Sequence, residues 1–181
     1  MVYPIPASLV TTNADEMNLF FNDINIVTKT ISRQFNFIDK NVIVKSFTEI
    51  IKALDISKEF APSLVQEYIE KEYEIRSFYL KGSFYSMAIF SQKNDATKID
   101  YRKPASIKSR SVPYNLPRNI EEKLVRLMTQ LNLDTGSIDI IKAKNGSFYF
   151  LEVNPNGIFE NVSFYCNYYL EKLIADHLNL K

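Results

Sequence analysis

The sequence predicts an α+β fold in which small antiparallel sheets alternate with helices. Three β-type runs follow one another in the middle of the chain, at 64–70, 73–80 and 83–92. Apolar residues spaced as on one helix face predict a helix over 119–132. The pair Asn145-Gly146 then separates two apolar runs and gives the strongest short signal for a β-hairpin.

The N-terminal third carries signals of two short helices and two strands. Asn13 and Glu16 are spaced as in a capping box, which predicts a helix over about 13–23. A second helix is expected to follow Thr48 and to end near Leu54. Runs rich in Ile, Val and Thr predict the two strands, 24–30 and 41–47.

The remainder of the chain predicts one long loop and one closing helix. Residues 93–118 are polar, basic and interrupted by three prolines, and loops of this length are usually functional or disordered. The closing helix is expected from about Val162 to Leu178. We expect Leu170, Leu173, Ile174 and Leu178 to lie on its buried side.

Composition excludes several classes of protein. With 181 residues, 46% hydrophobic residues and a net charge of +1, the sequence is typical of an ordinary globular protein, and nucleic acid is not an expected partner. No apolar run approaches the roughly 20 residues of a membrane span, and the N-terminus does not resemble a signal peptide. The single cysteine, Cys166, excludes an intrachain disulfide and favours a cytoplasmic location. We expect Cys166 to be a buried structural thiol and the lone His177 to have no catalytic role.

The hairpin itself predicts a candidate metal site. A two-residue loop places Lys144 opposite Ser147, and the same register places Asp139 opposite Glu152, with Cβ atoms roughly 5 Å apart. Asn154 is expected on the same face as Glu152.

Oxygen ligands from Asp139, Glu152 and Asn154 would suit Mg²⁺. The alternative is a solvated face, on which facing carboxylates need no partner. Alternation places Phe148 and Phe150 on the face of Glu152, which argues against that alternative. A structural cation site without any nucleotide is a further possibility.

These motifs resemble the ATP-grasp enzymes, which hold Mg-ATP between two α+β subdomains and activate a carboxylate as an acyl phosphate. The metal residues Asp139, Glu152 and Asn154 in DIIKAKNGSFYFLEVN match the arrangement of that family. The resemblance implies a small subdomain over 1–65, an adenine-binding hinge over 66–70 and a large subdomain over 71–181. The nucleotide-binding residues that it implies are Lys29 in IVTKT, Glu67 and Ile69 beside adenine, and Glu74 for the ribose hydroxyls.

Several segments resemble more specifically the grasp-with-spasm peptide maturases, relatives of the microviridin and graspetide ligases. The segments include EYIEKEYEIRSFYLKGSFYSMAIFSQ, RSVPYNLP, TGSIDII, FLEVNPNG and CNYYLEKLIADHL. The resemblance implies a ribosomal precursor peptide as substrate. It also implies ATP-driven ester or amide bonds between Asp or Glu carboxylates and Ser, Thr or Lys side chains.

The sequence departs from the pattern that this resemblance implies in three places. The family's N-terminal domain is expected to be missing before Met1, and the connection 31–41 contains no glycine to cover the phosphates with bare backbone. Ile158 follows Gly157, where the resemblance implies Gln. The first two departures favour the alternative of a truncated, non-catalytic nucleotide- or peptide-binding module. A homodimer is one expected way to complete the cleft.

Three arginines are candidates for catalysis. Arg76 shares a strand face with Glu74 and suits bidentate contacts to phosphate or acyl phosphate oxygens. The alternative for that pair is an ordinary surface ion pair. Arg102 and Arg110 in the basic loop are the preferred pair for phosphate and peptide carboxylates, and the alternative there is a solvated loop.

Overall fold

The computed structural model describes residues 4–22, 24–29, 31, 37–39, 42–44, 47–51, 57–106 and 108–179. The chain divides into two compact units. The larger unit comprises Met1–Ile5, Lys71–Phe90 and Ser109–Lys181, and the smaller unit comprises Pro6–Glu70 and Ser91–Lys108.

The smaller unit is built on a four-stranded antiparallel sheet with the order β1-β6-β2-β5. Helix α1 (Ala14–Phe21) packs on it through Met17 and Phe21, which are buried with Ile26 and Val65. A separate two-stranded ribbon pairs β3 with β4. The strands are β1 (Ser8–Asn13), β2 (Ile26–Lys29), β3 (Phe37–Asp39), β4 (Val42–Val44), β5 (Glu49–Ile51) and β6 (Glu59–Glu67).

Helix α1 begins at the predicted cap. The side chain of Asn13 accepts hydrogen bonds from the backbone N–H groups of Asp15, at 2.8 Å, and Glu16, at 3.1 Å. The reciprocal half of the capping box is absent. The Glu16 carboxylate instead accepts from the Thr11 hydroxyl, and the Asn13 N–H donates to Thr11 Oγ1 at 3.1 Å.

Replacing Asn13 with alanine is expected to lower the free energy of unfolding by about 1 kcal/mol, because two helix N–H groups lose their acceptor. Urea unfolding measures the change. Asn18→Ala on the exposed side of the same helix is the control. It is expected to raise stability by a few tenths of a kcal/mol, because alanine has the higher helix propensity.

The expectation of a helix after Thr48 is wrong for the residues that the structure describes in that segment. Glu49–Ile51 form β5, which pairs antiparallel with β2, so that Ile51 lies opposite Ile26. The β-branched pair Ile50-Ile51 favours a strand, and pairing with β2 satisfies its backbone. Residues 52–56 lie outside the described residues, as do parts of the glycine-free connection 31–41 and of the predicted strand 41–47.

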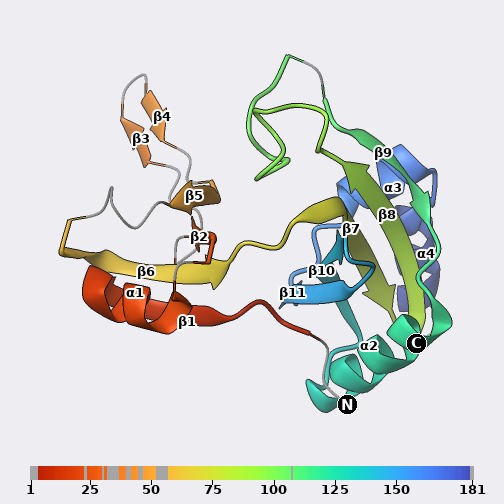
Figure 1. Ribbon diagram of the computed structural model, residues 1–181. Helices are drawn as coiled ribbons and strands as arrows, with labels where there is room; N and C mark the ends of the chain where they lie inside the picture. The colour runs from red at the N-terminus through yellow and green to blue at the C-terminus, as the bar shows by residue number, and fades with distance from the viewer. Residues whose placement is uncertain are drawn as a thin grey trace. The chain divides into compact units, whose positions relative to one another are not determined.

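The larger unit is a five-stranded antiparallel sheet with the order β11-β10-β7-β8-β9 (Figure 1). Helix α2 (Arg118–Gln130) covers one face, where Ile120, Leu124 and Met128 pack on Ile75 and Ile138. This is the apolar stripe that the sequence predicts. The strands are β7 (Lys71–Leu80), β8 (Ser83–Phe90), β9 (Arg110–Tyr114), β10 (Thr135–Ala143) and β11 (Phe148–Asn154).

Helix α3 (Glu160–Cys166) packs on the other face, beside β8 and β9 (Figure 1). The rings of Phe159 and Phe78 lie 5.3 Å apart, and those of Tyr168 and Tyr85 lie 5.6 Å apart. The Tyr168 hydroxyl also donates to the carbonyl of Ser86 at 2.9 Å. The residues that flank α3 therefore cover the cross-strand pair of Phe78 and Tyr85 on that face.

Two expectations for this unit are wrong. The predicted loop 93–118 contains β9, which is an edge strand and therefore tolerates Pro113. The predicted closing helix is two helices, α3 and α4 (Leu170–Asn179), because Asn167 and Tyr169 adopt left-handed backbone conformations with φ of 54° and 53°. Leu178, which was expected on the buried side of that helix, is 64% exposed.

The division into units differs from the predicted subdomain boundaries in two segments, Met1–Ile5 and Ser91–Lys108, and it includes the predicted hinge 66–70 in the smaller unit. Residues Ser91–Lys108 belong to the smaller unit, because Asp100 accepts a hydrogen bond from the Thr48 N–H and Lys103 pairs with Glu49 at 3.1 Å. The assignment of nucleotide-binding roles to the two units stays a prediction.

Candidate functional site

The hairpin that carries the candidate metal residues has a different turn from the predicted one. Ala143 donates to the carbonyl of Ser147 at 2.9 Å, so the loop has three residues, Lys144, Asn145 and Gly146. Gly146 has a φ of +88°, and Asn145 Oδ1 accepts from the Ser147 N–H at 2.9 Å. Glycine is required at this position because other residues rarely adopt that φ. The predicted two-residue turn is therefore wrong.

A β-bulge in β11 nevertheless produces the predicted pairing. Phe150 lies opposite Ile140, the register then shifts by one residue at Leu151, and Asp139 lies opposite Glu152. The longer turn and the extra residue compensate each other. The predicted pairing of Asp139 with Glu152 is confirmed, although its derivation assumed a shorter turn and an unbroken strand.

The bulge also decides which face each side chain occupies. Phe148, Phe150 and Val153 pack against the core under α2. Glu152 lies opposite Asp139 on the other face. The expectation that Phe148 and Phe150 share the face of Glu152 is wrong, because the extra residue reverses the alternation between Phe150 and Glu152. The strand therefore contributes aromatic rings to the core and a carboxylate to the opposite face.

Arg76, Asp139 and Glu152 form one cross-strand row on that face, from β7 to β11. Arg76 Nη1 donates to both carboxylate oxygens of Asp139, at 3.2 and 3.3 Å. Their side chains are 15% and 22% exposed, whereas Glu152 is exposed. Arg76 thus compensates one of two facing carboxylates, which would otherwise destabilise the sheet.

Asn154 lies opposite Ser137 in the next cross-strand pair on the same face. Its Oδ1 accepts from the Asn156 N–H at 3.1 Å, and its carbonyl accepts from the Gly157 N–H at 3.1 Å. The Ser137 hydroxyl donates to the carbonyl of Ile158 at 2.9 Å. These bonds fold the segment after β11 back over the end of the sheet.

The donor set on this face fits a hard cation. Two carboxylates and one amide lie on adjacent cross-strand pairs, which is the oxygen chemistry that Mg²⁺ prefers. Among the described residues, no cluster of three or more His, Cys, Asp and Glu side chains could hold a metal ion. Any ion bound here would therefore need oxygen atoms from Asn154, water or a substrate as further ligands.

A second bulge lies at the start of β7 and brings Lys71 to the face of Glu74. Tyr73 lies opposite Lys142, but Lys71 lies opposite Ala143, so Glu72 is the extra residue. Lys71 Nζ is hydrogen-bonded and ion-paired to Glu74 Oε1. Sequence reasoning missed Lys71, because regular alternation places residues three apart on opposite faces of a strand.

The structure shows an ion pair for each of Glu74 and Arg76. Glu74 pairs with Lys71 and Arg76 pairs with Asp139. These two ion pairs lie on one face of the sheet.

The other predicted nucleotide residues belong to the smaller unit. Lys29 lines a hollow of about 560 Å³ together with Thr28, Ile31, Phe47, Ala61, Pro62 and Ser63. The Glu67 carboxylate accepts from the Ala7 N–H at 3.2 Å, and Ile69 is buried. Adenine contacts by the backbone near Glu67 and Ile69 stay a prediction.

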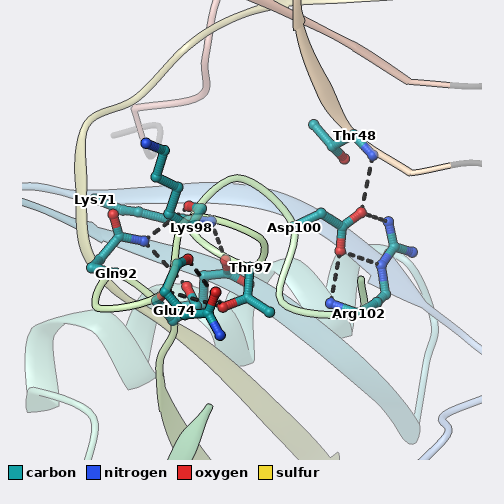
Figure 2. Close-up of polar contacts among 10 residues, drawn as sticks. Thr48, Lys71, Glu74, Gln92, Thr97, Lys98, Asp100 and Arg102 are labelled. Atoms are coloured by element: carbon teal, nitrogen blue, oxygen red, sulfur yellow. Dashed lines mark hydrogen bonds and ion pairs between the residues drawn. The ribbon is translucent and has the colours of Figure 1, made fainter. Parts of the chain in front are cut away.

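Arg102 anchors the basic segment Ser91–Lys108. Figure 2 shows the Asp100 carboxylate between Thr48 and Arg102, whose Nε and Nη2 donate to it at 2.8 and 2.6 Å. The backbone N–H groups of Arg102 and Thr48 donate to the same carboxylate, each at 3.0 Å. Burial by itself raises the pKa of Asp100, but these hydrogen bonds outweigh burial and hold the pKa below its ordinary value.

The structure does not bring Arg102 and Arg110 together within one unit. Arg110 begins β9 in the larger unit, where its guanidinium lies 5.9 Å from the ring centre of Phe90. Arg102 belongs to the smaller unit. Their predicted catalytic roles stay predictions.

Cys166 is buried, and burial raises the pKa of its thiol to about 11. A thiol with that pKa is protonated at neutral pH and is a poor nucleophile. The structure therefore agrees with a structural role for Cys166.

Within the described part of the chain, no helix is long and apolar enough to cross a membrane.

Comparison with known proteins gives matches among solved structures. No protein-family model matches the chain, and no curated protein does. An ATP-grasp ligase from Chryseobacterium gregarium is associated with a ribosomally synthesised and post-translationally modified peptide (RiPP) and was solved with ADP and a leader and core peptide. It is 28% identical at a TM-score of 0.79, over 87% of this chain and 49% of that one.

Two further solved structures match. The macrocyclase MdnC from Microcystis aeruginosa, bound with the precursor peptide MdnA, is 28% identical at a TM-score of 0.79, over 99% of this chain and 56% of that one. The ATP-grasp ligase PsnB was solved in complex with a phosphomimetic variant of its minimal precursor, Mg and ADP. It is 16% identical at a TM-score of 0.67, over 91% of this chain and 49% of that one.

The chain spans about half the length of each of these proteins. The matches confirm the predicted α+β class, since the described sheets and helices are those of the ATP-grasp neighbours. The chain therefore has the ATP-grasp fold, and the solved structures that it matches include RiPP ATP-grasp ligases.

Proposed function

We propose that the chain binds Mg-ATP and forms the catalytic core of an ATP-dependent ligase that acts on a ribosomal precursor peptide. The observation that carries the proposal is the cross-strand row of Arg76, Asp139 and Glu152, with Asn154 beside it on the same face. The relatives from C. gregarium and M. aeruginosa, which were solved with peptides, support a peptide as the substrate. PsnB, solved with Mg and ADP, supports the cofactors.

In this proposal each site residue has a defined role. Asp139, Glu152 and Asn154 would hold Mg²⁺, which when bound neutralises phosphate charge and polarises phosphate oxygens. Arg76 orients phosphate or acyl phosphate oxygens through its guanidinium. Arg102 and Arg110 bind phosphate and peptide carboxylates. The nucleotide residues are Lys29, Glu67, Ile69 and Glu74.

The reaction is a two-step transfer. A side-chain carboxylate of the peptide attacks the γ-phosphorus of ATP, the bond from that phosphorus to the β-bridging oxygen breaks, and ADP leaves. A Ser or Thr hydroxyl or a Lys amine then attacks the acyl carbon and loses its proton, and phosphate departs. The products are an ester or an amide, ADP and phosphate.

The single cysteine and the precursor-peptide substrate also lead us to propose a cytoplasmic location.

Glu152→Gln is expected to weaken Mg-dependent ATP binding by about tenfold, because the site loses one of its two negative charges while keeping an oxygen ligand. Calorimetry with ATP, in the presence and absence of Mg²⁺, measures the change. Glu160→Gln, on an exposed position of α3, is the control and is expected to bind as the unsubstituted chain does. Equal binding with and without Mg²⁺ would contradict the proposal.

A non-catalytic nucleotide- or peptide-binding module is the second candidate. The Arg76–Asp139 ion pair favours it, because that carboxylate already has a cationic partner without a metal. Formation of ADP with a precursor peptide distinguishes the two candidates. Mg-ATP binding without ADP formation would identify the module.

A further inference from the structure

Lys71 is the most buried charged side chain of the candidate site. Its side chain is 4% exposed and that of its partner Glu74 is 15% exposed. Lysine is almost never fully buried unless it is paired, and a buried ion pair is a weak source of stability. A structural role alone therefore does not explain why this position carries a lysine.

The backbone is adapted to make this contact. Without the bulge at Glu72, alternation would place Lys71 on the α2 side with Tyr73, away from Glu74. Bulges are frequent beside active sites, where they redirect a side chain. Here the extra residue turns Lys71 to the face that carries Glu74, Arg76 and Asp139.

The surroundings of Glu74 strengthen the contact. Glu74 lies opposite Ile89 on one neighbouring strand and Ile141 on the other. Between two isoleucines, an ion pair is screened less than it is in water. A carboxylate has about four acceptor sites, so it can accept a bond from Lys71 and bonds from other donors at the same time.

We propose that Lys71 is a positioning residue that fixes the Glu74 carboxylate in the orientation in which it accepts the ribose hydroxyls of ATP. This inference rests on the proposed function, in which Glu74 contacts the ribose. Lys71 acts through Glu74, so its removal should affect only nucleotides that carry those hydroxyls.

The test compares ATP with 2′,3′-dideoxy-ATP, each with Mg²⁺, by calorimetry. The unsubstituted chain is expected to bind ATP about tenfold more tightly, as one hydrogen bond to a charged group provides. Lys71→Met keeps the apolar stem and removes the charge. It is expected to weaken ATP binding by about tenfold and to leave dideoxy-ATP binding within about twofold, so the preference disappears.

Matched variants keep the outcome decisive. Lys71→Arg keeps a charge in a different geometry and is expected to retain part of the preference, even if Lys71→Met does not fold. Lys81→Met removes the surface pair of Lys81 with Asp134, whose Nζ–Oδ2 distance is 3.9 Å, and is expected to change neither affinity. Equal weakening of both nucleotides in Lys71→Met, or an unchanged preference in both Lys71 variants, would overturn the inference and leave ATP binding intact. Absence of binding by the unsubstituted chain would overturn the proposed function as well.

Discussion

Replacing Asp139 with leucine is expected to lower the free energy of unfolding by about 2 kcal/mol. The substitution leaves Arg76 without the carboxylate that accepts two of its hydrogen bonds, in a position where its side chain is only 15% exposed. Loss of one partner from a fully buried ion pair costs about 3–5 kcal/mol, and partial exposure and the nearby Glu152 reduce that figure. Urea unfolding at low ionic strength measures the change.

The double variant Asp139→Leu/Arg76→Met separates loss of the pair from loss of packing. It is expected to recover most of the lost stability, because neither charge then remains without its partner. A double variant as unstable as Asp139→Leu alone would show that the cost comes from packing around position 139. In either case, we expect both variants to lose Mg-dependent ATP binding.

Replacing Asp100 with asparagine is expected to lower the free energy of unfolding by about 3 kcal/mol at pH 7. The Asp100 side chain is only 3% exposed, and its carboxylate accepts four hydrogen bonds, two of them from the guanidinium of Arg102. Bonds to charged groups contribute about 1.5–3 kcal/mol each, and an amide leaves at least one donor unmatched. Asp95→Asn, at an exposed position of the same segment, is the control and is expected to change stability by less than about 0.5 kcal/mol.

The contribution of Asp100 depends on pH in a defined direction. Because its pKa in the folded protein lies below the ordinary value of 3.8, its stabilisation is complete above that value and is lost as the pH falls through the lower, folded pKa. The stability difference between the unsubstituted chain and Asp100→Asn should therefore be constant above about pH 5 and shrink below about pH 4. A difference that grew on acidification would contradict the assignment.

Local signals in the sequence predict much of the fold. The Asn13 cap and the apolar stripe on α2 act within one helix, and both lie where the sequence predicts them. Strands rich in β-branched and aromatic residues are likewise close to their expected positions. The helix expected after Thr48 fails because pairing with β2, which is distant in sequence, determines the structure of Glu49–Ile51.

The candidate site was predicted less directly. The facing pair of Asp139 and Glu152 is present, but it depends on a three-residue turn and a bulge that no local pattern indicates. Lys71 was missed for the same physical reason, since a bulge changes the face of a side chain without a sequence signal. The break between α3 and α4 depends on Asn167, whose left-handed backbone is one of several conformations that asparagine tolerates.

Because of the bulge in β11, the residue number alone does not give a residue's cross-strand partner or its face of the sheet. A homologous strand one residue shorter, without a counterpart of Leu151, would place its glutamate opposite the same aspartate and its aromatic residues in the same core. An alignment with such a strand therefore needs a single-residue gap at Leu151. A comparison without that gap would pair Glu152 with the wrong residue and would hide the candidate metal residues that the two strands share.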